Sequence, residues 1–266
     1  MESYTTLEVA RRAGVLRITL NRPEKRNALN PALMDELTGV LGAAGEDASC
    51  GVVLVTGAGS AFCAGLDLEH LQSLEDRNAA EHRADSERIA KLLRTLYDCP
   101  LPTIAAVNGA AIAGGCGIAT LCDFTLAVPR AKFGYTEVRI GFIPAIVSTF
   151  LLAQVGEKQA RDLLLTGRIF EAAEAHAMGL VNRVVEAEDL LPAAERLAAH
   201  LLENSPEALA ATKRLLSANA RAVLDAEIER AIQANADARL TGDFREGIRA
   251  FLEKRTPQWP SLKMED

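Results

Sequence analysis

The sequence contains no run of four or more lysines or arginines, and its acidic residues outnumber its basic ones. Its 266 residues include 29 Lys or Arg and 36 Asp or Glu, so the net charge is -7 and the isoelectric point is near 5.3. A surface with this charge repels a phosphate backbone. We therefore expect no nucleic acid among the partners of this protein.

Long apolar stretches are missing as well. No segment of about 18 uninterrupted apolar residues, the length of a membrane-spanning helix, occurs in the chain. The first six residues, Met-Glu-Ser-Tyr-Thr-Thr, also lack the basic start and the apolar run of a signal peptide. We expect a cytoplasmic protein that has no contact with a membrane.

Cysteine and histidine are scarce. The five cysteines are odd in number and contain no Cys-x-x-Cys pair, which argues against a disulfide framework. The four histidines are scattered along polar stretches, without the two-histidine spacing of a metalloprotease helix. We therefore expect no bound metal, and we interpret the histidines as surface or packing residues.

Apolar residues are abundant, in a moderately charged background. Hydrophobic residues make up 49% of the chain and charged residues 24%, which is typical of soluble globular proteins, and the length fits one large domain or one domain with a helical appendage. Apolar runs at 52–55, 103–107 and 124–128 predict buried strands, which alternate with helical patterns at 78–97 and 110–121. This alternation favours an α/β domain in which helices pack on sheets.

The two ends of the chain have different patterns. Apolar residues on both sides of Gly14 predict an opening β-hairpin, and Asn30-Pro31 predicts the start of a helix. Beyond residue 157, one predicted strand at 181–185 interrupts a series of predicted helices at 157–165, 171–178, 188–203, 206–218, 226–236 and 244–254. We divide the chain into a catalytic core at 1–200 and a helical region at 201–266, whose apolar stripes need another surface to cover them.

Two predicted strands end in glycine and are each followed by a helix-like segment. Gly57 precedes the stretch from Cys63 to Asp67, and Gly109 precedes the stretch 113–117. Two backbone N–H groups that converge on one point form an oxyanion hole, and a helix N-terminus adds to their attraction for negative charge. This arrangement suits a thioester oxygen that becomes an enolate. The alternative is that these glycines only permit close packing of helices.

A set of motifs in fixed order resembles the signature of the enoyl-CoA hydratase/isomerase (crotonase) superfamily. The matching segments span nearly the whole chain and include Asn21-Arg22-Pro23, Asn27-Ala28-Leu29, Phe62-Cys63-Ala64-Gly65, Asn108-Gly109, Gly114-Gly115-Cys116, Phe133-Gly134, Leu165-Thr166-Gly167 and Phe251-Leu252-Glu253-Lys254. The resemblance implies an α/β crotonase (ClpP-like) fold, a spiral of ββα units with a helical C-terminal trimerisation region. It also implies a homotrimer, or a hexamer made of two trimers.

The same resemblance implies roles for single residues. The backbone amides of Leu66 and Gly114 would form the oxyanion hole, and Glu137 would be the catalytic base. The residues implied in binding the substrate and its CoA are Ala28, Ala64, Gly65, Asp67, Gly117, Phe251 and Lys254. Phe251 and Lys254 match positions that reach CoA bound to a neighbouring subunit. The implied substrate is an acyl-CoA thioester that brings its own coenzyme A, so the resemblance implies no separate cofactor, metal or nicotinamide.

The chain departs from the hydratases of this family at one position. These enzymes generally use two glutamates, and the first would stand at position 117, where this chain has Gly117. Glycine transfers no proton, so Glu137 remains as the single carboxylate of the pair. One base is enough to shift a double bond, and isomerases of the family often have an apolar residue at this position. For hydration, a water beside Gly117 or a movement of Glu69 would have to replace the missing group.

Hydration or dehydration and isomerisation therefore both stay open, with decarboxylation or hydrolysis ranked below them. The segment from Glu137 to Gly141 and the C-terminal Glu-Lys-Arg look closer to hydratases. A crotonase homologue that only binds acyl-CoA is a further alternative, but the retained Glu137 argues against it. RNA binding, known within the superfamily, is disfavoured by the acidic balance. A catalytic Glu137 needs a raised pKa, which apolar neighbours such as Phe142 and Ile143 would provide by partial burial.

Overall fold

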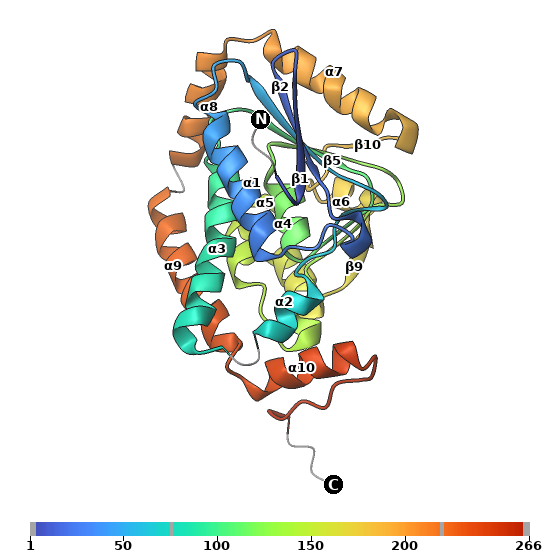
Figure 1. Cartoon of the computed structure of the whole chain (residues 1–266), viewed down its shortest axis with the longest axis vertical. Coiled ribbons are helices and arrows are strands. Elements are labelled where there is room, and N and C mark those ends of the chain that lie inside the picture. The colour runs from blue at the N-terminus through green and yellow to red at the C-terminus, as the bar shows by residue number, and fades with distance from the viewer. Residues whose placement is uncertain (1–3, 75–76, 219–220, 263–266) are drawn as a thin grey trace.

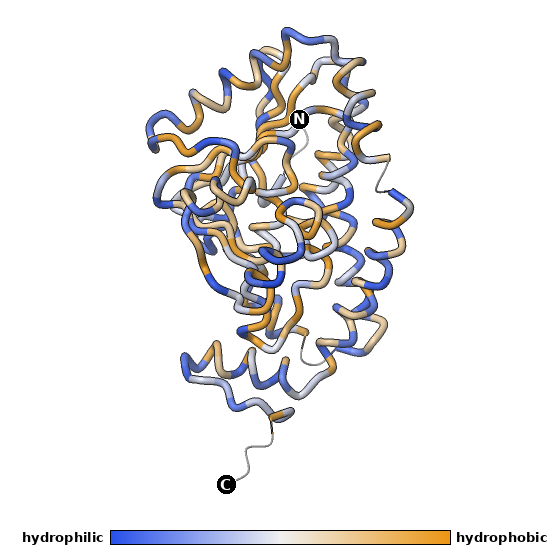
Figure 2. The backbone as a smooth tube through the Cα atoms, turned by 180° about the vertical axis from the view of Figure 1, so that it is seen from behind, coloured by the Kyte–Doolittle hydropathy of each residue, from blue (hydrophilic) through white to orange (hydrophobic). Residues whose placement is uncertain are grey.

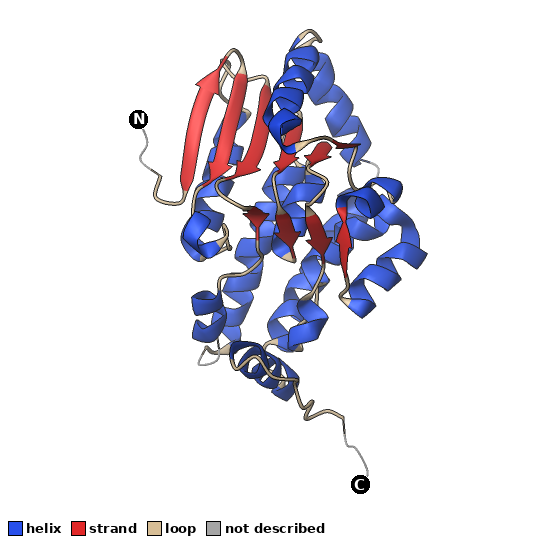
Figure 3. Ribbon diagram, turned by 90° about the vertical axis from the view of Figure 1, so that its right-hand side faces the viewer, coloured by secondary structure: helices blue, strands red, loops and turns tan. Residues whose placement is uncertain are grey.

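The computed structural model describes residues 4–74, 77–218 and 221–262, which form two sheets with helices packed around them. In Figure 3 the larger sheet lies above the smaller one, helices surround both, and the last helix lies at the opposite end from the larger sheet. This is the α/β class expected from the sequence.

The larger sheet has six strands in the order β1-β2-β3-β5-β7-β10. Their bounds are Leu7–Arg12, Val15–Leu20, Val52–Gly57, Thr103–Val107, Phe124–Ala127 and Arg183–Val184. The strands β1 and β2 form an antiparallel hairpin, as predicted, and the other pairs are parallel. The hairpin turn uses Ala13 and Gly14, whose positive φ values of 49° and 80° match the twist of the flanking strands.

A second sheet of four short strands is absent from the sequence-based prediction. Its order is β4-β6-β8-β9, with bounds Ala61–Cys63, Ala110–Ile112, Lys132–Gly134 and Ile169–Glu171. Each strand has three residues, too few to show an alternation in the sequence. The predicted helix over 110–121 is therefore wrong at its beginning, because residues 110–112 belong to β6 and helix α4 starts at Gly114.

The helices are α1 Pro31–Ala44, α2 Leu68–Ser73, α3 Ala79–Tyr97, α4 Gly114–Leu121, α5 Ala145–Thr166, α6 Ala172–Ala177, α7 Leu190–Leu202, α8 Pro206–Ala218, α9 Arg221–Ala238 and α10 Gly242–Leu252, with 3-10 turns η1 Pro23–Lys25, η2 Glu137–Ile140 and η3 Ala187–Asp189. Asn30 caps α1, because its side chain accepts the N–H of Leu33 at 2.9 Å. Helix α5 begins at Ala145, well before the predicted start at residue 157, since Gly156, with a φ of 74°, interrupts its helical pattern.

Apolar residues fill the space between the sheets and the helices. Figure 2 shows hydrophobic stretches in orange concentrated in the interior, whereas the outer helices alternate between orange and blue. The main core joins the strands of both sheets to the buried faces of α1, α3, α4 and α5, with Ile18, Leu54 and Ile104 among its fully buried members. Within the described ranges, no helix is long and apolar enough to cross a membrane.

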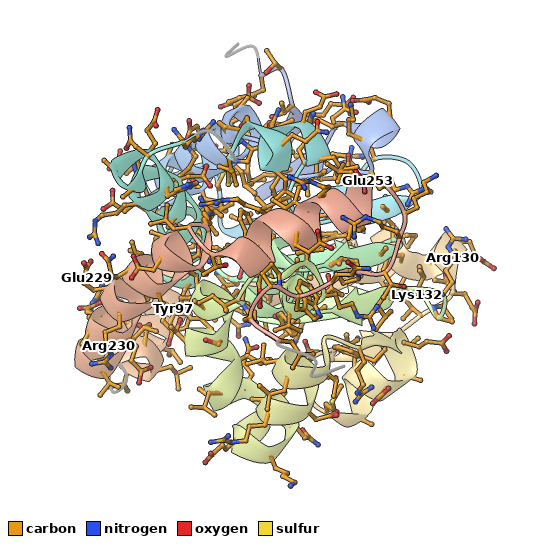
Figure 4. The ribbon with its side chains drawn as sticks, turned by 90° about the horizontal axis from the view of Figure 1, so that it is seen from below. Tyr97, Arg130, Lys132, Glu229, Arg230 and Glu253 are labelled. Carbon is orange, nitrogen blue, oxygen red and sulfur yellow. The ribbon has the colours of Figure 1, made fainter. Side chains whose placement is uncertain are left out.

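Beyond residue 202 the described chain forms helices α8, α9 and α10, followed by non-helical residues 253–262, and α9 and α10 return to the core. Helix α9 packs on α3 and α5, and α10 covers η2 (Figure 1). In Figure 4 this part of the ribbon crosses the lower end of the molecule, from Glu229 and Arg230 of α9 to Glu253 just after α10. Helix α10 contacts the rest of the molecule through an apolar cluster, in which its Phe244 and Ile248 pack against Leu71, Leu74 and Phe142. Gly247 allows the close approach, since a Cβ there would lie 2.2 Å from the carbonyl carbon of Ile140.

Candidate active site

Three parallel strands of the smaller sheet end at one edge. Strand β4 pairs with β6, and β6 pairs with β8, all in parallel. The carboxyl ends of parallel neighbours lie side by side, and α/β folds bind their ligands at such an edge. Leu66, Gly114 and Glu137 follow these three strands in the chain. The sheet therefore brings together the three residues that the sequence predicts as catalytic.

A cavity of about 490 Å³ lies at this edge. The predicted site residues that line it are Ala28, Ala64, Gly65, Leu66, Asp67, Gly114, Glu137 and Phe251. Gly117 and Lys254, also predicted as ligand-binding residues, are not among its lining residues. Phe251 borders the cavity of its own chain, because α10 folds back over η2. The expectation that Phe251 and Lys254 reach a ligand in a neighbouring subunit stays a prediction.

The backbone around Leu66 is held in an extended conformation beside Leu29. The N–H of Leu29 donates to the carbonyl of Gly65 at 2.7 Å, and the N–H of Asp67 donates to the carbonyl of Leu29 at 2.9 Å. In extended chain, successive N–H groups point in opposite directions. The N–H of Leu66 therefore points away from Leu29, and Leu66 lines the cavity, so this amide is placed to donate to a ligand.

The second amide, that of Gly114, starts helix α4 after a sharp turn. Ala113, with φ 51° and ψ -124°, has a backbone conformation that is strained for a residue with a side chain. Its N–H donates to the carbonyl of Gly134 at 2.7 Å, which ties the turn to β8. Gly65 lies against this turn, since a Cβ at Gly65 would be 3.2 Å from the Cβ of Ala113. Leu66 and Gly114 directly follow the two residues in contact and both line the cavity. The amide of Gly114 also lies at a helix N-terminus, which favours negative charge.

Glu137, at the start of η2, lines the same cavity, and it is buried. Its exposed fraction is 9%, and its Oε2 atom has no hydrogen-bond partner within the described residues. Burial raises the pKa of this carboxyl group to about 7. Ile140, Phe142 and Ile143 line the same cavity, as expected for apolar walls around a general base. A carboxyl group with this pKa can accept and return a proton near neutral pH.

Two basic residues also line the cavity. Lys25 and Arg26 do so beside Glu24, and none of the three is in the sequence-based set of site residues. Arg22 stands behind them, where its guanidinium donates to the carbonyl of Ala28 at 2.5 Å and pairs with Asp67 at 2.8 Å. The ion pair between Arg22 and Asp67 therefore holds the segment 22–28 in place. The sequence signal that could have drawn attention to this part of the cavity is the set of basic residues Arg22, Lys25 and Arg26 in one short stretch.

The position of the missing glutamate is filled by apolar groups. Gly117 is buried, and a Cβ there would lie 2.8 Å from Cγ1 of Val147 and 3.7 Å from the side chain of Leu93. Val147 therefore occupies the space in which the sequence-based argument places a water. Glu69, considered as a replacement, is exposed and bonded to Lys25 at 2.5 Å, and it is not among the residues that line the cavity. Neither position 117 nor position 69 therefore places a second carboxylate in the cavity with Glu137.

Comparisons with known proteins show which family this chain resembles in sequence and in fold. The family model described as enoyl-CoA hydratase/isomerase matches residues 10–262. A relative from Thermus thermophilus is 45% identical over 242 residues, which cover 91% of this chain and 96% of the relative. The crotonyl-CoA hydratase of Syntrophomonas wolfei is 38% identical and covers 89% and 90% of the two chains. The crystal structure of an enoyl-CoA hydratase/isomerase from Xanthobacter autotrophicus superposes with a TM-score of 0.87 at 33% identity, over 95% of this chain and 98% of the other.

Proposed function

Because this chain belongs to the enoyl-CoA hydratase/isomerase family, it is an enzyme that acts on acyl-CoA thioesters, and we propose that Glu137 alone transfers the proton in the reversible hydration of a 2-enoyl-CoA. The observation that carries this proposal is the buried Glu137, with an unpartnered Oε2, at the same sheet edge as the amides of Leu66 and Gly114. The similarity to a crotonyl-CoA hydratase supports hydration as the reaction.

The proposed steps need one carboxylate and two amides. Ionised Glu137 takes a proton from water while the water oxygen bonds to C3 of the enoyl chain. The electron pair of the double bond moves towards the thioester, and the amides of Leu66 and Gly114 stabilise the negative charge on its oxygen. Protonated Glu137 then returns its proton to C2, which leaves a 3-hydroxyacyl-CoA and the ionised carboxylate. The raised pKa of Glu137 suits both halves of this exchange.

A second candidate is the shift of a double bond between 3-enoyl-CoA and 2-enoyl-CoA. The packing of Val147 against Gly117 favours it, because this contact removes the position from which a second carboxylate activates water. In this reaction Glu137 removes a proton from C2 and returns it to C4, with the same two amides holding the dienolate. The two candidates therefore differ in whether water enters the product.

Heavy-oxygen water distinguishes the two reactions. The purified protein is incubated in this water with 2-enoyl-CoA in one sample and with 3-enoyl-CoA in the other, and the products are identified by mass. We expect 3-hydroxyacyl-CoA with one labelled oxygen from the 2-enoyl substrate. A shifted double bond without label would establish isomerisation instead. No product from either substrate would contradict both candidates and favour a protein that only binds acyl-CoA.

The rate should depend on the ionisation of Glu137. We expect kcat/KM for hydration to rise about tenfold per pH unit below a midpoint near 7 and to level off above it, because only the ionised carboxylate accepts a proton. Initial rates between about pH 5.5 and 8.5, with the stability of the enzyme checked at each pH, measure this profile. A profile that stays flat through this range would show that no group with this pKa takes part.

We also propose that residues 201–266 join copies of the chain into a trimer or a hexamer. Exposed apolar side chains on α8 and at the start of α9 support this, namely Leu215, Leu216 and Val223. The proposed chemistry needs no metal or cofactor beyond the coenzyme A that the substrate carries. A cytoplasmic location stays a prediction.

A further inference from the structure

Apolar residues form part of the cavity wall, and one amide side chain lies among them. The wall includes Ile89, Phe142, Ile143, Ile146 and Val147, and Asn235 of helix α9 lines the cavity with them. Asn235 is buried, with an exposed fraction of 4%. A buried amide that faces a ligand cavity needs hydrogen-bond partners, since an unpaired polar group without water is unfavourable.

The hydrogen bonds of Asn235 are incomplete. Its Oδ1 accepts from the hydroxyl of Ser86 at 2.8 Å, and its Nδ2 donates to the carbonyl of Ile143 at 3.5 Å, a long distance for such a bond. An amide nitrogen has two N–H donors, so the second donor has no acceptor within the described residues. The Ser86 hydroxyl also lies 2.9 Å from the carbonyl oxygen of His82, and its one hydrogen can serve only one of these two acceptors. The carbonyl oxygen of Ile143 therefore sets the orientation, because the reversed amide would place Oδ1 against it.

A buried guanidinium lies one helical turn beyond Asn235. Arg239 has a fully buried side chain that pairs with Asp85 at 2.7 Å and stacks over the ring of Phe142, with 5.3 Å to the ring centroid. Its Nε and Nη2 atoms have no hydrogen-bond partner within the described residues. Phe142 is itself part of the cavity wall. Arg239 itself is not among the lining residues, and it lies behind Phe142 in a pair with Asp85. The free N–H of Asn235 is therefore the donor in this wall that an oxygen acceptor can pair.

We propose that the enzyme selects acyl chains that carry a hydrogen-bond-accepting oxygen at the end far from the thioester, and that Asn235 is the residue that recognises it. The inference rests on the proposed function, because the thioester must lie at the amides of Leu66 and Gly114 for the chain to point towards Asn235. A chain that ends in a methyl group would cover the free N–H without pairing it. That loss corresponds to binding weaker by about tenfold or more.

Binding of unreactive substrates tests the proposal directly. Saturated acyl-CoA thioesters are compared in sets of equal chain length that end in a methyl group, a ketone or a carboxylate, over a series of lengths, by titration calorimetry. At the length that spans the cavity, we expect the wild-type protein to bind the oxygen-bearing ligands about tenfold or more tightly than the methyl-ended one. Tighter binding of the carboxylate than of the ketone would assign part of this preference to the charge of Arg239.

The matched variants are Asn235→Leu and Gln233→Leu. Both replace an amide on α9 with leucine, but Gln233 is exposed and outside the cavity, with its amide bonded to Arg83 and Asp237. We expect Asn235→Leu to lose the preference and to gain affinity for the methyl-ended ligand, while Gln233→Leu keeps the wild-type pattern. Equal or tighter binding of the methyl-ended ligand by the wild-type protein at every length overturns the proposal, even if Asn235→Leu does not fold. Retention of the preference by folded Asn235→Leu overturns it as well.

The outcome of this binding test does not depend on the outcome of the activity test, because saturated thioesters have no double bond to hydrate or shift. A protein that prefers oxygen-bearing ligands but converts no enoyl-CoA would disprove the proposed reaction and leave the recognition by Asn235 standing. A protein that hydrates enoyl-CoA but does not prefer oxygen-bearing ligands would support the proposed reaction and disprove the recognition by Asn235.

Discussion

Replacing Glu137 with glutamine should lower kcat about a thousandfold while leaving the affinity for acyl-CoA nearly unchanged. Glutamine has the size of glutamate but neither takes nor gives a proton, and general acid–base catalysis contributes a factor of about 10² to 10⁴. The residues that we expect to bind CoA, and the amides of Leu66 and Gly114, do not need the Glu137 carboxylate for their contacts with the ligand. Steady-state rates with 2-enoyl-CoA, together with calorimetric binding of a saturated acyl-CoA, measure the two effects separately.

Glu69→Gln is the matched control for this variant. Glu69 is the other carboxylate considered for the site, and its exposed side chain bonds to Lys25 outside the set of lining residues. We expect this control to keep most of the activity. Turnover by Glu137→Gln at a tenth of the wild-type rate or more would remove Glu137 from the proton transfer, and a large loss in Glu69→Gln would show that Glu69 moves into the site.

The Glu137→Gln substitution should also change how the free energy of unfolding depends on pH. Because the folded protein raises the pKa of Glu137 from 4.5 to about 7, the folded state holds this proton more tightly than the unfolded chain does. The wild-type protein therefore loses stability relative to the variant as pH rises from about 4.5 to about 7. Above that pH the variant should be more stable by about 3 kcal/mol. The free energies of unfolding of the wild type and the variant, measured with denaturant near pH 5 and near pH 8, show whether the difference between them grows with pH.

Replacing Asp85 with alanine should lower the free energy of unfolding by about 3 to 5 kcal/mol, the usual cost of leaving a buried charge without its partner. Asp85 and Arg239 both have fully buried side chains and join α3 to α9 at 2.7 Å, and His70 contacts the same carboxylate at 2.8 Å. Burial opposes ionisation of Asp85, but the hydrogen bond from His70 and the charge of Arg239 outweigh it and hold the pKa at about 2. The carboxylate therefore stabilises the fold above about pH 4, and this contribution is lost as pH falls through about 2.

The control for Asp85→Ala is Asp35→Ala. Asp35 pairs with Arg88 at 3.0 Å, but its side chain is 62% exposed, so its removal should cost less than about 1 kcal/mol. Urea unfolding of both variants at neutral pH gives the comparison. A loss below about 1 kcal/mol for Asp85→Ala would contradict the assigned role of the pair in fixing α9. The double variant Asp85→Leu, Arg239→Met should recover much of the lost stability, since it leaves no unpaired charge.

Local chemistry explains which parts of the fold the sequence could predict. The hairpin at Ala13 and Gly14, the cap at Asn30 and the long amphipathic α3 each depend on neighbouring residues alone, so their patterns are visible in the chain. The smaller sheet depends on pairing between strands of three residues that are far apart in sequence. Such strands carry no periodic signal, and for this reason the sequence predicts a helix that includes residues 110–112, which form β6.

By itself, the sequence determined the family and the substrate class, because a motif preserves residue types and spacing, and it predicted Leu66, Gly114 and Glu137 as the catalytic residues. The tertiary structure decided what surrounds them. It placed Val147 in the space beside Gly117, buried Glu137 so that its pKa rises, and brought Asn235 of α9 into the wall of the cavity. Each of these facts depends on contacts between segments distant in the chain, and an asparagine in a charged helix has no local signature that reveals what it will face. The physical reason is that burial and shape arise from packing, which the order of residues specifies only through the whole fold.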